Sequence, residues 1–97
     1  MFLEKYVDEF YFTNILNTYK EEFLLTLDEE NFIKIYNLFK KNKFDFIEDI
    51  ILKYLEIFTL DYNKVNNKLN ELKNILGENY QSIISNDMKY LYKIIEN

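Results

Sequence analysis

The sequence predicts an all-α fold: a compact helical domain of about five to seven helices. Apolar residues recur at three- and four-residue spacing along most of the 97-residue chain, which is the period of an amphipathic helix. One Gly and no Pro leave little to interrupt helices, and no alternating apolar run marks a strand. Because 48% of the residues are apolar and 19% are aromatic, the core can be large for this chain length.

Composition bounds the class of protein. The length fits one domain, residues 1–97, with one core. Ala, Arg, His, Cys, Pro and Trp are missing, while Phe, Tyr, Ile, Asn and Lys, which have AT-rich codons, are abundant. This bias indicates an AT-rich bacterium, or its phage or plasmid, as the source. The sequence has no cysteine, no signal-like start and no run of about 18 uncharged apolar residues. We therefore expect a soluble cytoplasmic protein with no membrane partner.

The first segment, residues 1–25, is predicted to be helical. Its apolar residues from Phe2 to Phe23 keep helical spacing except for a slip around Thr13-Asn14, which indicates one bent helix or two. Acidic residues at a helix start complement the helix dipole and form a solvated face. The acidic positions of this segment are Glu4, Asp8, Glu9, Glu21 and Glu22.

Two helices are predicted over residues 28–58. Asp28 begins the first, with Leu27 packing on Phe32 as a hydrophobic staple, and Asn42 follows its end. The second begins at a capping box made by Asp45 and Glu48 and ends before Asp61. Its predicted buried side consists of Ile47, Ile50, Ile51, Tyr54, Leu55 and Phe58.

The strongest start and stop signals bound the next predicted helix, from Asp61 to about Leu76. Asp61 is the predicted N-cap, and Gly77, the only glycine, is the predicted left-handed C-cap. A short helix over residues 80–85 and a final helix from Asp87 complete the chain. The residues expected to point inward from the final helix are Met88, Leu91, Tyr92 and Ile95.

Part of this pattern repeats. Thr26-Leu27-Asp28 recurs as Thr59-Leu60-Asp61, 33 residues later, and the apolar stripe keeps the same offset. This spacing is typical of a two-helix solenoid unit, so we predict repeats over residues 26–58 and 59–97, with residues 1–25 as an N-terminal cap or partial repeat. Ile15-Leu16 would then parallel Ile50-Ile51.

Leu60-Asp61, Gly77 and Ile83-Ile84 give residues 26–97 a resemblance to the helical repeats of the mitochondrial transcription termination factor family. Val65, Leu69, Leu72 and Leu91 belong to the same pattern. The resemblance implies a curved solenoid that binds nucleic acid through basic side chains. The chain departs from the family in having barely two units, no proline near Asn86-Asp87, no arginine and a net charge of −5.

The residue types argue against catalysis. There is no His or Cys to act as base or nucleophile, the only serines are Ser82 and Ser85, and no Gly-rich loop could hold phosphate. The densest carboxylate group, Asp45, Glu48 and Asp49, fits helix capping better than an acid–base pair or a divalent-cation site. We therefore expect no enzyme activity, no cofactor and no metal.

What remains is interaction. A short repeat array has two open ends that need covering, and tyrosine is enriched at interface centres. We predict a protein-binding helical module, a small acidic regulator or inhibitor, whose partner is another protein, including one with a basic surface made for nucleic acid, or a second copy. A bacteriocin-immunity type of helical protein would share the size but has no motif here. The predicted contact residues are the acidic face (Glu4, Asp8, Glu9, Glu21 and Glu22) together with Tyr90 and Tyr92, while Tyr11, Tyr62 and Tyr80 are further tyrosines beyond what the core needs.

The alternative is nucleic-acid binding by basic residues of the two equivalent helices. Phosphate binding needs such a stripe of positive charge, although the overall negative charge of the protein opposes it. The predicted lysine stripe consists of Lys34, Lys40, Lys41, Lys43, Lys64, Lys68 and Lys73.

Overall fold

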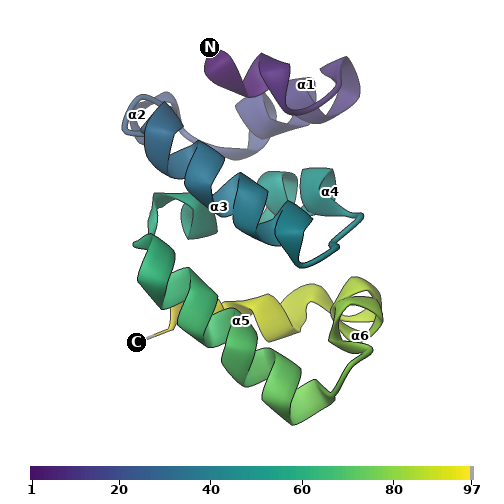
Figure 1. The fold of residues 1–97 in the computed structure, drawn as a ribbon. Coiled ribbons are helices and arrows are strands. Elements are labelled where there is room, and N and C mark those ends of the chain that lie inside the picture. Colours follow the sequence, from purple (N-terminus) through teal and green to yellow (C-terminus); the bar gives the residue numbers. More distant parts are fainter. Residues whose placement is uncertain (97) are drawn as a thin grey trace.

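The computed structural model describes residues 1–96, in which seven α-helices and three 3-10 helices follow one another without a strand (Figure 1). The prediction of an all-α fold is therefore confirmed. Asn97, the last residue of the second predicted repeat, lies outside the described residues. In chain order the elements are η1 (Phe2–Lys5), α1 (Glu9–Thr18), α2 (Glu21–Leu24), α3 (Glu29–Lys41), α4 (Ile47–Lys53), η2 (Leu55–Thr59), α5 (Tyr62–Leu76), α6 (Tyr80–Asn86), η3 (Met88–Leu91) and α7 (Tyr92–Ile95), where η marks a 3-10 helix.

The helices stack in three layers along the long axis of the molecule (Figure 1). The first layer contains η1, α1 and α2; the second contains α3, α4 and η2; the third contains α5, α6, η3 and α7. Between layers, α1 packs on α4, α3 packs on α5, and α7 packs on η2. The α3–α5 contact joins elements that hold corresponding places in neighbouring layers.

Element starts in the second and third layers recur with one offset. The starts of α3 and α5, of α4 and α6, and of η2 and η3 are each separated by 33 residues, from positions 29, 47 and 55 to positions 62, 80 and 88. This agrees with the spacing of the predicted unit. Descent of the two layers from one ancestral repeat stays a prediction.

One cluster of buried apolar side chains runs through the three layers. Three fully buried rings lie near its middle: Phe32 stacks on Phe58 at 4.8 Å between ring centroids, and Phe39 lies 5.8 Å from Phe58. Among residues 1–96 no polar or charged residue is fully buried. In the same part of the chain, no helix is long and apolar enough to cross a membrane.

Helix α5 begins and ends where its signals predict. The Asp61 carboxylate accepts from the amides of Asn63 and Lys64 at 3.1 and 3.4 Å. Gly77 follows the helix with φ of 87°. Its ψ of −168° lies outside the left-handed helical region, so the predicted left-handed cap is wrong in detail, although a positive φ still favours glycine. At the start of α3, Asp28 occupies the N-cap position but makes no capping hydrogen bond.

The predicted helix over residues 45–58 is divided. Its six predicted inward residues are all buried, but the helix begins at Ile47 without a side-chain cap, so the capping box of Asp45 and Glu48 is wrong. The α-helix stops at Tyr54 and continues as η2. The amide of Leu55 donates to the Tyr19 hydroxyl at 3.0 Å, which replaces a bond of the α-helical ladder.

The first and last segments also correct the expectations. Residues 1–25 form η1 and two α-helices, α1 and α2, that meet at Tyr19-Lys20. At the C-terminal end, Tyr92 is 51% exposed and Ile94 is fully buried, whereas the α-helical period predicts Tyr92 inside. The 3-10 turn of η3 has about three residues per turn, so Leu91 and Ile94 share the buried side.

Candidate functional site

The predicted acidic face is exposed but divided by α1. Asp8 is the N-cap of α1 and accepts from the Tyr11 amide at 3.0 Å, so its carboxylate has a structural task. Glu4 lies 3.4 Å from the N-terminal amine, and Glu9 stands in the first turn of α1. Glu21-Glu22 stand in the first turn of α2, beyond the other end of α1.

The excess of acidic residues lies in the first third of the chain, which includes the first layer and the start of α3. Residues 1–30 contain eight acidic residues and two lysines, whereas residues 31–97 contain nine acidic residues and ten lysines. One of the two early lysines, Lys5, is paired with Glu29 at 3.0 Å. The other, Lys20, is exposed. Three of the eight acidic residues, Asp28, Glu29 and Glu30, stand at the start of α3. The first layer itself therefore has five acidic residues and two lysines.

The first layer also exposes apolar side chains. Of the six large apolar side chains exposed within residues 1–96, four belong to this layer: Met1, Phe10, Leu16 and Leu25. Leu25 is 77% exposed and Leu16 is 48% exposed. Such exposure gathered at one end of a small protein is typical of an interaction surface.

Three of these side chains line one groove of about 380 Å³ between the N-terminus, α1 and α2. The exposed Glu21 is the one acidic residue of its lining. Sequence reasoning placed Leu16 in a buried stripe and did not single out Leu25. A usable signal was the run Phe23-Leu24-Leu25, because three successive side chains of one helix cannot all face the core. We name this feature the end groove; its apolar lining is Met1, Phe12, Leu16, Tyr19, Leu24 and Leu25.

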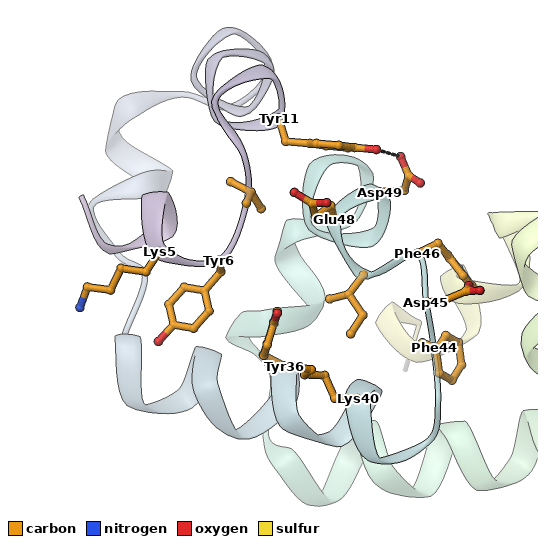
Figure 2. A pocket seen from close by; sticks show the side chains of 12 residues that line it. Lys5, Tyr6, Tyr11, Tyr36, Lys40, Phe44, Asp45, Phe46, Glu48 and Asp49 are labelled. Carbon is orange, nitrogen blue, oxygen red and sulfur yellow. Dashed lines mark hydrogen bonds between the residues drawn. The ribbon is translucent and has the colours of Figure 1, made fainter.

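A larger cleft of about 580 Å³ lies between the first layer and the α3–α4 turn (Figure 2). The Glu48 carboxylate accepts from the Asp8 amide at 2.9 Å, and the Asp49 carboxylate accepts from the Tyr11 hydroxyl at 2.8 Å. Figure 2 shows Tyr11 directed at Asp49, whereas Lys5 extends away from both carboxylates. These carboxylates hold the first layer on the second.

The electrostatics of this joint follow from the same contacts. The hydrogen bond to Asp49, then burial and the nearby carboxylates, raises the pKa of Tyr11 to about 12. Tyr11 is therefore neutral and donating across the physiological range. Among residues 1–96, no group of three or more acidic, His or Cys side chains could hold a metal ion.

The predicted lysine stripe is only partly brought together. Lys34 and Lys41 line a groove of about 560 Å³ between α3 and the start of α5. Lys41, Lys43 and Lys73 line another of about 330 Å³, together with Glu78. The other members lie apart from these grooves: Lys40 over the Tyr36 ring at 5.4 Å, Lys68 in an ion pair with Glu71 at 3.6 Å, and Lys64 half-buried on α5.

Lys43 has an unusual backbone. Its φ is 65°, and it is the one non-glycine residue with positive φ among residues 1–96. It follows α3 in a Schellman arrangement, in which the Lys43 amide donates to Lys40 and the Phe44 amide donates to Phe39. The rings of Phe39 and Phe44, 5.1 Å apart, complete the motif. A lysine stands where glycine is preferred.

The predicted contact tyrosines belong to the third layer, away from the acidic face along the chain. Tyr90 is half-buried and packs on the core. Tyr92 is exposed and meets Tyr54 edge-on, with 5.3 Å between ring centroids. Burial raises the pKa of Tyr54, and the neighbouring Tyr92 hydroxyl adds to this shift. Tyr80 is buried and donates to Asn42 at 3.2 Å, so it belongs to the core rather than to a patch.

The geometry makes the end groove the strongest candidate site, because it joins exposed apolar area with the charged layer. No protein-family model, curated protein or solved structure matches the chain. The resemblance to termination-factor repeats stays a prediction. It is carried by the sequence pattern of Leu60-Asp61, Val65, Leu69, Leu72, Gly77, Ile83-Ile84 and Leu91.

Proposed function

We propose that this protein is a non-enzymatic protein-binding module that docks through the end groove. One observation carries the proposal: four exposed apolar side chains and five acidic side chains, against two lysines, gather on the same layer. Apolar area supplies affinity, while charge selects the partner and speeds its approach. A surface of this kind fits a partner with apolar side chains set among basic ones.

The biological role that fits is a small acidic regulator or inhibitor acting in the cytoplasm of an AT-rich bacterium, or encoded by its phage or plasmid. The cysteine-free composition and the codon bias support this setting. The acidic side chains of the first layer would dock on a basic surface of the partner protein, including a surface that otherwise binds nucleic acid. Glu21 and Glu22 carry this role together with Glu4 and Glu9, since Asp8 is used as a cap.

The test is affinity capture from lysate of an AT-rich host, with and without nuclease, using the full chain as bait. Leu25→Glu places a charge in the end groove, and the matched control Ile75→Glu changes a side chain of similar exposure, 66%, on α5. We expect a protein partner that survives nuclease, is lost with Leu25→Glu and is kept with Ile75→Glu. Reversal of Glu9, Glu21 and Glu22 to lysine should also lose it. Equal capture by all variants would contradict the proposal.

A second candidate, nucleic-acid binding, is favoured by one observation: Lys41, Lys43 and Lys73 surround a single groove. This predicts affinity for DNA or RNA that falls steeply with salt, because each phosphate contact releases counterions. Changing Lys41 and Lys73 to glutamate should abolish it. Binding that ignores both salt and these substitutions would remove the candidate.

A further inference from the structure

We infer that the end groove receives a basic amphipathic helix of the partner protein, in the place that a long helix occupies in the other two layers. This inference rests on the proposed function and names the chemistry of its partner. It is carried by three observations: the arrangement of elements within the layers, the burial of corresponding side chains, and the distribution of charge.

The layers share an order of elements. In the second layer the long helix α3 packs on η2 and α4, and in the third layer the long helix α5 packs on α6 and α7. The first layer has counterparts of the later elements, since α1 and α2 end at positions 18 and 24, 35 residues before the ends of α4 and η2 at positions 53 and 59. At the place of the long helix, residues 1–96 supply only the four-residue η1.

Corresponding side chains of the three layers differ in burial. The 35-residue offset matches Leu16 to Ile51, and the 33-residue offset matches Ile51 to Ile84. Ile51 and Ile84 are both fully buried, whereas Leu16 is 48% exposed. The side chain is apolar in all three layers, so the first layer keeps the residue type of a packed position without the packing.

The lining of the end groove suits a helix. Phe12 and Leu16 are four residues apart on α1, Leu24 ends α2 and Leu25 is its C-cap, so the groove runs between two helices. An entering helix would place apolar residues there at spacings of three and four, as α3 does with Phe32, Ile35 and Phe39. The helix pattern is therefore required of the occupant.

Acidic side chains near the end groove favour a positively charged helix as its occupant. Glu21 lines the groove and Glu22 follows it in the chain, both exposed, while the Glu4 carboxylate is paired with the N-terminal amine of Met1 at 3.4 Å. Residues 1–30 contain two lysines. Lys5 is paired with Glu29, and Lys20 has no acidic partner at salt-bridge distance among residues 1–96. Two copies facing each other through this surface would bring Glu21 and Glu22 of one copy near those of the other, because a twofold interface joins the same patch of each copy. A basic helix avoids that repulsion.

The probe is a fluorescent 18-residue peptide with leucine at positions i, i+3, i+4 and i+7 and lysine elsewhere, about five helical turns long. Its control carries glutamate in place of every lysine. Fluorescence anisotropy with the full chain at physiological salt should show the basic peptide binding about tenfold or more tightly than the acidic one. Leu16→Glu and Leu25→Glu should each weaken binding about tenfold, and Ile75→Glu should leave it unchanged. Circular dichroism of each variant confirms that it is folded.

Three results would overturn the inference. Equal affinity for the two peptides would remove the charge argument, and unchanged affinity of Leu25→Glu would remove the groove. Light scattering that shows a dimer broken by Leu25→Glu would make the surface a contact between copies. The proposed function fails separately: a partner whose capture depends on Leu25 but is not displaced by the basic peptide keeps the protein-binding role and rejects only the helix.

Discussion

The first layer differs from the other two in what covers it, although its later elements resemble theirs. Ile51 and Ile84 lie in the core, and Leu16, at the matching position, faces the end groove. Tyr19 and Tyr54 stand at matching helix ends, and both pKa values are raised by burial. The comparison teaches that an apolar periodic pattern fixes the local element, while burial depends on whether a partner element is present.

The largest expected effect tests this difference in cover. Ile51→Ala should lower the free energy of unfolding by about 2 to 5 kcal/mol, because it leaves a cavity in a closed core. Leu16→Ala should change it by less than about 0.5 kcal/mol, because the side chain is half solvated. Chemical denaturation measures both. Similar costs would mean that Leu16 is covered and that no open groove exists.

The next largest effect on the free energy of unfolding concerns the N-caps of α3 and α5, in the second and third layers. Asp61→Ala removes two hydrogen bonds at the start of α5 and should cost about 1 kcal/mol. Asp28→Ala, at the matching start of α3, removes no capping bond and should cost less than half of that. Equal losses in denaturation would show that the two starts are built alike in solution.

The joint between the first and second layers is expected to depend on pH. Tyr11→Phe removes the hydrogen bond to Asp49 and should lower the free energy of unfolding by about 1 kcal/mol at neutral pH. The folded pKa of Tyr11, about 12, lies above the unfolded value of about 10. The neutral form is thus favoured by folding, and its contribution is present below pH 10 and lost as the pH rises toward 12.

The measurement is the ultraviolet absorbance of tyrosinate during alkaline titration, compared between the wild type and Tyr11→Phe. The difference curve should show a group that titrates near pH 12. A difference curve centred near the ordinary tyrosine value of about 10 would show that the bond to Asp49 does not form.

The smallest effect concerns the ends of the two long helices. Lys43→Gly relieves a positive φ at the end of α3 and should raise the free energy of unfolding by about 0.5 to 1 kcal/mol. Gly77→Ala should lower it by a similar amount through the backbone alone, because a Cβ there meets no atom within 4 Å. Thermal unfolding of both variants checks the signs. A destabilised Lys43→Gly would mean that the lysine side chain supports the fold.

Much of the fold could be predicted from the sequence because its signals are local. Asp61 begins α5 with its side-chain carboxylate and Gly77 ends it with a positive φ, and the 33-residue spacing reappears in the element starts. The divided helix at Tyr54 was missed because the cause, the Tyr19 hydroxyl, comes from 36 residues away. The pairing of Glu48 with the Asp8 amide is equally remote in sequence.

The candidate site was predicted only in part, for the same reason. The acidic residues are visible in the sequence, so the charge of the first layer could be predicted. The end groove exists because no element of residues 1–96 packs over Leu16 and Leu25, and no local sequence pattern shows this. The place of Tyr92 was mistaken because a 3-10 turn changed the helical phase before it.

The central claim is that the uncovered end of the first layer is a binding surface for a basic helix. The most direct measurement is a nitrogen–proton correlation spectrum of the labelled chain during titration with the basic peptide. The account predicts that shifts concentrate at Phe12, Leu16 and residues 19–25, and that Ile75 and the lysines of α3 and α5 stay unperturbed. Shifts centred on α3 and α5, or no shifts at all, would contradict it.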